Sequence, residues 1–255
     1  MLYAYAIIGD HAGDREDLLP LQGILSGVPV RRLSFGELAA VVSSVPEEVF
    51  GAEALRARME DTQWTRMLVL SHQRVVSGLL DVATVLPLKF CTLFSGEAAL
   101  AEAIAGRREG LEQAVARLRG ASEWGVKIFY EAPTLTAPPL EPAVAGTGAA
   151  FFRRKKEEQQ ARAVAEAALD RAVSISHQRL GALARAAVAN PVQPPELHGQ
   201  SGAMVLNGAY LVARQDEGAW RACLSDLERA HAAEGVRYAL TGPWAAYNFA
   251  GGVLV

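Results

Sequence analysis

The sequence has few cysteines, no long uncharged apolar run and no excess of positive charge, and each shortage excludes a class of protein. Cys91 and Cys223 are the only cysteines in 255 residues, and both lie in apolar surroundings. Two buried thiols in a reducing compartment explain this pattern best, although a lone disulfide is compatible with the count. The formal net charge of -3 provides no general basic field for nucleic acid or anionic lipid.

Membrane insertion is not expected either. No uncharged apolar run approaches the roughly 20 residues that a membrane-spanning helix needs. The N-terminal residues lack the basic segment of a signal peptide. Hydrophobic residues make up 51% and charged residues 21% of the chain, which is typical of a globular protein with a sizeable core. We therefore expect a soluble, cytoplasmic protein that binds neither nucleic acid nor membrane.

Motifs for catalysis and metal binding are also missing. No Cys-x-x-Cys or His-x-x-x-His spacing occurs, so we expect no metal site and no cofactor. No Gly-x-Ser-x-Gly elbow and no suitably spaced acid–base pair is present, so we expect no catalytic residue. The chain has five histidines, which are His11, His72, His177, His198 and His231.

Periodicity predicts alternating strands and helices in the first half of the chain. Asp61 is placed to cap a new helix within the helical stretch 52–81. The expected strands are 2–8, 30–35, 38–44, 84–94 and 123–131. The expected helices are 52–81 and 96–120.

One stripe of the helix at 52–81 is apolar except for His72. Trp64, Leu68, Val75 and Leu79 fall on the same narrow face at a period of 3.6 residues. The favoured interpretation of His72 is a histidine at the edge of the core, hydrogen-bonded to backbone or to a carboxylate. A functional role in a cleft with Lys89 is the alternative.

The segment 84–94 is the most distinctive strand-like stretch. Pro87 removes a backbone donor, so this strand is expected at a sheet edge or with a bulge. Lys89 and, in the later strand, Lys127 have two interpretations. They either block edge-to-edge aggregation or form a paired basic spot.

The strand at 123–131 alternates cleanly between two faces. Trp124, Val126, Ile128 and Tyr130 share one face. Glu123, Lys127 and Glu131 share the other, together with Gly125 and Phe129.

A change of composition divides the chain in two. Prolines and glycines at 132–148 indicate a linker. The following stretch, 149–189, is helical in pattern and would be roughly 60 Å long if straight, so it either bends near Gly181 or projects. The expected second-domain elements after it are 197–214 as one or two strands, 217–233 as a helix and 236–240 as a strand.

These elements predict an α+β fold with two domains. Residues 1–131 form a ferredoxin-like α/β sandwich in this prediction. Residues 149–255 form a smaller α+β domain that begins with the long helix.

An aromatic turn at 241–249 closes the chain. Its aromatic residues belong either to the core or to an exposed apolar patch that binds a partner. The candidate protein-interaction residues are Pro87, Lys89, Phe90, Lys127, Trp244, Tyr247 and Phe249.

Seven segments in order give the sequence a family resemblance. Trp64 with His72 forms one of them. The others are LYAY at 2–5, GELAAVVS at 36–43, VLPLKF at 85–90, EWGVK at 123–127, LNGAYLV at 206–212 and TGPW at 241–244. Together they resemble the gas vesicle protein family GvpL/GvpF. Two positions depart from the family pattern, which usually has glycine at Cys91 and proline-proline at Ala245-Ala246.

The resemblance implies a non-enzymatic accessory protein of gas vesicle formation with two α+β domains, the first ferredoxin-like. Its implied partners are the small hydrophobic shell protein and other accessory gas vesicle proteins, and its implied location is the cytoplasm and the gas vesicle. Two further hypotheses stay open. One is a small-molecule enzyme or sensor with a cleft near His72 and Lys89, and the other is self-association through the helix at 149–189.

Overall fold

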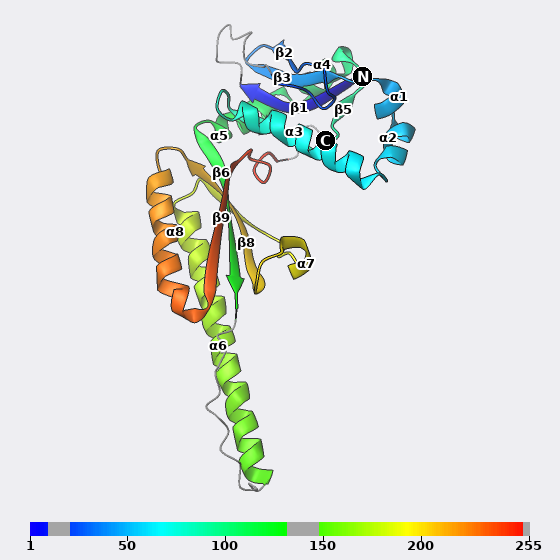
Figure 1. The fold of residues 1–255 in the computed structure, drawn as a ribbon. Coiled ribbons are helices and arrows are strands. Elements are labelled where there is room, and N and C mark those ends of the chain that lie inside the picture. The colour runs from blue at the N-terminus through cyan, green and yellow to red at the C-terminus, as the bar shows by residue number, and fades with distance from the viewer. Residues whose placement is uncertain (10–20, 132–147, 252–255) are drawn as a thin grey trace. The chain divides into compact units, whose positions relative to one another are not determined.

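The computed structural model describes residues 1–9, 21–131 and 148–251. The fold is mixed α/β with two antiparallel sheets and one long helix, in agreement with the predicted fold class. Contacts divide the chain into two compact units. The first is Met1–Glu123 with the C-terminal segment from Gly242, and the second is Trp124–Thr241 (Figure 1).

The sheet of the first unit is built around its N-terminal strand. The strand order is β2-β3-β1-β4, and β5 also pairs with β1. Every residue of β1 from Leu2 to Ile8 is buried, because β1 has neighbours on both edges and apolar side chains on both faces. The strands are β1 (Leu2–Gly9), β2 (Arg31–Phe35), β3 (Leu38–Ser44), β4 (Val85–Pro87) and β5 (Leu93–Phe94).

Five helices accompany this sheet among the described residues. They are α1 (Glu47–Phe50), α2 (Ala52–Arg58), α3 (Thr62–Leu79), α4 (Glu97–Ala105) and α5 (Arg108–Leu118). Asp61 caps α3 by accepting hydrogen bonds from the backbone N–H groups of Gln63 and Trp64, which confirms the predicted break. The predicted stripe is also confirmed, since Leu68, Val75 and Leu79 are buried.

The segment 84–94 is both at an edge and interrupted, as Pro87 suggested. β4 and β5 pair with the same side of β1, and the turn between them closes with the Thr92 backbone N–H donating to the carbonyl of Lys89 at 3.2 Å. The backbone N–H of Leu88 donates to Tyr5 and that of Ala4 to Thr92, both at 2.9 Å. The chain therefore moves away from β1 after β4 and pairs with it again in β5. The backbone groups of Ala4 and Tyr5 keep hydrogen-bond partners across this interruption.

Cys91 lies in this turn with φ of +62°, the left-handed region that disfavours side chains with a Cβ. Cys91 and Cys223 are both free thiols, as the favoured prediction held, but only Cys223 is buried and Cys91 is partly buried. Burial raises the pKa of the Cys91 thiol to about 11, so the thiol stays protonated at neutral pH.

The second unit has a four-stranded sheet in the order β7-β8-β6-β9. Its core gathers large side chains such as Trp124, Tyr210 and Trp220. The strands are β6 (Ala121–Tyr130), β7 (Ala186–Asn190), β8 (Ala203–Ala213) and β9 (Val236–Trp244). The helices are α6 (Gly148–Ala182), α7 (Pro195–His198), α8 (Glu217–His231) and the 3₁₀ turn η2 (Ala232–Glu234).

Two expectations about this half were wrong. The strand predicted at 123–131 was assigned to the first domain, yet β6 is an inner strand of the second sheet. The helix predicted at 149–189 ends at Ala182, and β7 follows. Ala186–Asn190 is alanine-rich, but its pairing with Asn207–Leu211 of β8 outweighs helix propensity. The predicted linker lies outside the described residues except for Gly148, which begins α6.

Helix α6 has a packed half and an exposed half. Ala172, Ser176 and Leu180 are buried at a spacing of four residues, one face of a helix. The residues from 155 to 167 are all exposed. At 1.5 Å per residue its 35 residues span about 52 Å, so α6 extends beyond the sheet of its own unit (Figure 1).

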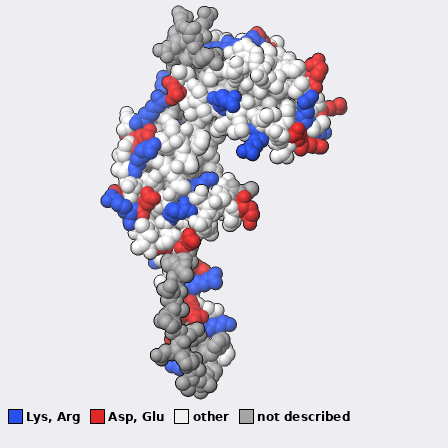
Figure 2. Space-filling view, in the orientation of Figure 1, with Lys and Arg blue, Asp and Glu red and all other residues white. Residues whose placement is uncertain are grey.

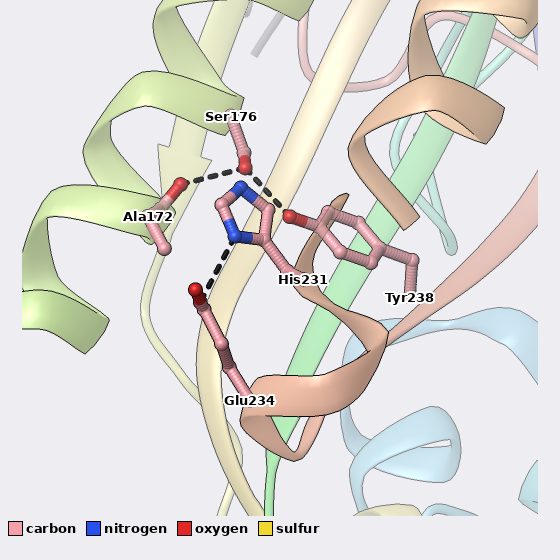
Figure 3. Close-up of polar contacts among 5 residues, drawn as sticks. All are labelled: Ala172, Ser176, His231, Glu234 and Tyr238. Atoms are coloured by element: carbon pink, nitrogen blue, oxygen red, sulfur yellow. Dashed lines mark hydrogen bonds and ion pairs between the residues drawn. The ribbon is translucent and has the colours of Figure 1, made fainter. Parts of the chain in front are cut away.

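Polar contacts hold the packed half of α6 against β9 (Figure 3). The Ser176 hydroxyl donates to the carbonyl of Ala172 at 2.6 Å and lies 2.7 Å from the Tyr238 hydroxyl. The His231 ring stacks on Tyr238, and its Nδ1 lies 3.0 Å from a carboxylate oxygen of Glu234. These side chains connect α6, α8, η2 and β9.

The backbone at Cys91 generates a first prediction. Cys91→Gly should be more stable than Cys91→Ala by about 1 kcal/mol, because both remove the thiol and only alanine keeps the Cβ that is strained at positive φ. Urea unfolding measures the difference. Ala116→Gly, at an exposed position inside α5, is the matched control and should cost about 1 kcal/mol. An alanine variant at 91 at least as stable as the glycine variant would contradict this account.

Candidate interaction site

His72 connects three segments of the first unit that are distant in sequence. Its Nδ1 lies 2.9 Å from the Tyr3 hydroxyl in β1, and its Nε2 lies 3.0 Å from the Tyr247 hydroxyl near the C-terminus. The Tyr3 hydroxyl also accepts the backbone N–H of Cys91 at 3.0 Å. His72 of α3 therefore joins β1 to the C-terminal turn, and Tyr3 extends this connection to the turn at 88–92.

Aromatic rings surround this histidine. The ring centroids of Tyr3, Tyr5 and Phe90 lie 5.7, 5.8 and 5.9 Å from that of His72. The Tyr5 hydroxyl accepts the backbone N–H of Ile24 and lies 2.6 Å from the Ser43 hydroxyl. Every polar atom named here thus has a partner, as buried polar groups require.

The His72 cluster is electrically neutral near pH 7. Burial lowers the pKa of His72 to about 4, although a backbone hydrogen bond at Leu88 acts in the opposite direction. Burial, and to a smaller extent the charge of Glu123, raises the pKa of Tyr247 to about 12. A neutral imidazole has one donor and one acceptor nitrogen, and a hydroxyl can complement either, so both tautomers are satisfied.

These contacts decide between the two interpretations of His72. The histidine is 3% exposed and hydrogen-bonded, as the favoured interpretation held. A backbone hydrogen bond at Leu88 agrees with that interpretation, and the side-chain partners are two tyrosine hydroxyls rather than a carboxylate. Its environment stabilises the neutral, solvent-excluded form. This arrangement gives no support to the alternative of a reactive cleft near His72 and Lys89.

The C-terminal turn is held to the first unit by further polar contacts. The carboxylate of Glu123 accepts the Asn248 backbone N–H at 3.0 Å and the Asn248 amide N–H at 2.7 Å. The Arg117 guanidinium donates to the carbonyl of Phe249 at 2.7 Å. These contacts fix the C-terminal turn, in which Ala245 and Ala246 are buried.

Glu123 was missed as a structural residue. Strand alternation grouped it with Lys127 and Glu131 on the more polar face, but its side chain is buried. Burial raises its carboxyl pKa, and the hydrogen bonds from Asn248 oppose that shift. No local sequence signal pairs residue 123 with residue 248, so only the tertiary structure identifies this contact.

The seven predicted interaction residues fall into three groups. Pro87 and Phe249 are buried and therefore cannot form an open surface. Lys89 is exposed, Phe90 is partly buried, and Trp244 and Tyr247 are 41% and 36% exposed. Phe90 and Tyr247 meet at His72.

Lys127 lies apart from this group. It is half-buried in the second unit, where its Nζ donates to the Gln193 side chain at 3.0 Å. Lys89 belongs to the first unit. The structure thus gives no support to the hypothesis of a paired basic spot.

A further exposed apolar surface lies on α3, opposite its buried stripe. Met67 and Leu70 are 54% and 55% exposed and lie three residues apart, hence on one helix face. Arg66 and Arg74 are exposed on the same helix, which contains no acidic residue. The signal was present in the sequence, since both apolar residues lie outside the stripe that contains His72.

Two features are absent from the described residues. No helix among them combines the length and apolar character needed to cross a membrane. No group of three or more histidine, cysteine, aspartate or glutamate side chains among them is arranged to hold a metal ion.

Residues 1–251 match the family described as gas vesicle synthesis protein GvpL/GvpF. The chain belongs to this family. Gas vesicle protein L of Streptomyces sp. strain CB03234 is 33% identical over 242 residues, which cover 91% of this chain and 90% of that protein. Gas vesicle protein F2 of Halobacterium salinarum is 26% identical over 252 residues, which cover 97% and 91%.

Solved structures of family members share the fold. The crystal structure of GvpF from Anabaena sp. PCC7120 superimposes with a TM-score of 0.68 at 20% identity, covering 98% of this chain and 95% of that one. GvpF from Microcystis aeruginosa gives 0.66 at 17% identity and covers 98% of both chains. Membership of the GvpL/GvpF family gives this protein a role in gas vesicle formation.

The depressed pKa of His72 generates a second prediction. The unfolded chain binds a proton near pH 6.5 and the folded chain near pH 4, so the contribution of neutral His72 is complete above pH 6.5 and is lost as pH falls toward 4. The free energy of unfolding should fall in this window by up to about 1.4 kcal/mol per pH unit relative to His72→Gln, which does not titrate. Denaturant unfolding at a series of pH values measures the difference. A difference between the two proteins that stays constant from pH 7 to pH 4 would refute the assignment.

Proposed function

We propose that this protein is a non-enzymatic accessory factor that binds the small hydrophobic shell protein, and other gas vesicle proteins, while the vesicle is nucleated or formed. The observation that carries the proposal is the family match over residues 1–251. The family match indicates the process in which the protein takes part, and two exposed surfaces of the first unit supply candidate contacts.

The exposed face of α3 is the first such surface. Met67 and Leu70 each leave about half of their apolar surface in contact with water. This exposure is unfavourable in free energy, and polar residues at the same positions would avoid it. Methionine adapts its shape to a partner, and the nearby Arg66 and Arg74 favour an acidic rim around an apolar contact. A shell subunit with an amphipathic helix fits this surface by its apolar face.

The segment around Phe90 is the second surface. Phe90 and Tyr247 meet at His72, and Lys89, next to Phe90 in the chain, is exposed. Trp244, three residues before Tyr247, is 41% exposed, and aromatic residues are frequent anchors in protein interfaces. The hydrogen-bonded His72 beneath them fixes Phe90 and Tyr247 in place. A rigid anchor loses little conformational entropy on binding.

The charge distribution is also suited to protein partners. Figure 2 shows Lys and Arg interspersed with Asp and Glu on the face in view, and the net charge of the sequence is -3. Such a surface keeps a protein in solution without selecting for nucleic acid. Binding of a hydrophobic subunit before its incorporation is the task that these properties support best.

Co-purification tests the proposal. The tagged full chain is co-expressed with the shell protein, and Leu70→Lys should lower the amount of retained shell protein about tenfold or more, because the substitution places a charge in the apolar contact. Leu183→Lys, at a leucine that is 41% exposed in the second unit, is the matched control and should retain wild-type binding.

The outcome that would overturn the proposal is equally specific. It fails if the wild-type chain retains neither the shell protein nor another gas vesicle protein, and if cells that lack the chain still form vesicles. Equal loss of binding in both leucine variants would remove α3 from the binding surface.

A further inference from the structure

Among the described residues the two sheets have four edges, formed by β2, by β4 together with the two-residue β5, by β7 and by β9. The strands β2, β4 and β9 contain residues that hinder pairing with another strand. In the first sheet, β2 contains Arg31 and Arg32, and β4 contains Pro87. In the second sheet, β9 contains Arg237 and Pro243. Charges and prolines at sheet edges are the usual protection against edge-to-edge association.

The fourth edge, β7, contains neither a charge nor a proline within the strand, although Arg185 precedes it and Pro191 follows it. Its sequence is Ala-Ala-Val-Ala-Asn, and no charged residue occurs from Ala186 to Pro195. Val188 is 37% exposed, and Ala189 is also exposed. Among the described strands β8 alone pairs with β7, so one side of the β7 backbone has no strand partner.

We propose that β7 is a self-association edge, at which a second copy of this chain pairs antiparallel with β7 and joins the two second-unit sheets into one. Alternate residues of an edge strand direct their N–H and C=O groups away from the sheet, and another extended backbone satisfies them. This inference is independent of shell-protein binding.

The composition of β7 makes it complementary to itself. Antiparallel pairing about Val188 places Ala187 opposite Ala189 and Ala186 opposite Asn190. Small, uncharged side chains then face one another, without the like-charge repulsion that two copies of an arginine-bearing edge would meet. The outward Val188 faces its own copy on the two-fold axis.

The protection of the other edges determines the size of the assembly. A two-fold contact uses the same patch on both copies, so pairing consumes β7 in each. Because β9, at the other side of the same sheet, carries Arg237 and Pro243, the joined sheet does not grow further. The expected product is a closed dimer.

The dimer is expected to be weak. A strand of five residues buries much less than the roughly 1,200 Å² of stable interfaces, so a Kd above about 1 µM is expected. Sedimentation equilibrium of the full-length chain over a wide range of concentrations should therefore show a reversible shift from monomer to dimer.

Charge at the centre of β7 tests the assignment. Val188→Lys places two lysines opposite each other and should weaken dimerisation at least tenfold, while Val188→Thr, which keeps a neutral β-branched side chain, should retain it. Val164→Lys is the matched control, since Val164 is 63% exposed on α6, and should dimerise like the wild type. Circular dichroism confirms that each variant is folded.

A cross-link tests the register separately. Under oxidised glutathione, Val188→Cys should form a disulfide-linked dimer, whereas Val164→Cys and the wild type, with its own Cys91 and Cys223, should not. A wild type that stays monomeric at the highest attainable concentration overturns the proposal. So does a Val188→Lys variant that dimerises as well as the wild type. A monomeric wild type whose binding of another gas vesicle protein is lost in Val188→Lys would also overturn it, because the occupant of the edge would then be that protein.

Discussion

The hydrogen bonds of His72 to Tyr3 and Tyr247 are the contacts on which the first unit depends most. They join α3, the central strand β1 and the C-terminal turn, and His72 and Tyr3 are buried there. The same tyrosine hydroxyl accepts the backbone N–H of Cys91, so the turn between β4 and β5 is fixed by the same cluster. Burial keeps the imidazole neutral, which turns a residue often used in catalysis into a structural one.

In the second unit, helix α6 is too long for its four-stranded sheet to cover it completely. The packed half of α6 uses Ala172, Ser176 and Leu180 against the core, while the residues from 155 to 167 remain in water. A polar exposed half is tolerated without a partner, as solvated charges and alanines have little to gain from burial. The apolar edge at β7 is the stronger indication of association in this unit.

Family membership and surface chemistry are the two observations on which the functional proposal rests. The chain belongs to a family of gas vesicle synthesis proteins, and its most unusual surface features are exposed apolar side chains on α3 and an unprotected strand edge. The two features differ in kind. The helix face offers apolar side chains for packing, whereas the strand edge offers backbone hydrogen-bonding groups.

Several elements could be predicted from the sequence because local chemistry controls them. These are the cap at Asp61, the buried stripe of α3, the hairpin β2–β3 and the interrupted edge strand at Pro87, because capping groups, periodicity and a missing donor act over a few residues. The sequence also identified the family through its ordered segments. Only the tertiary structure decided that β6 belongs to the second sheet, that Ala186–Asn190 is a strand, and that Glu123 is buried against Asn248. Each of these three features depends on a partner that is distant in the chain. Strand alternation and helix propensity are local patterns and do not identify such a partner.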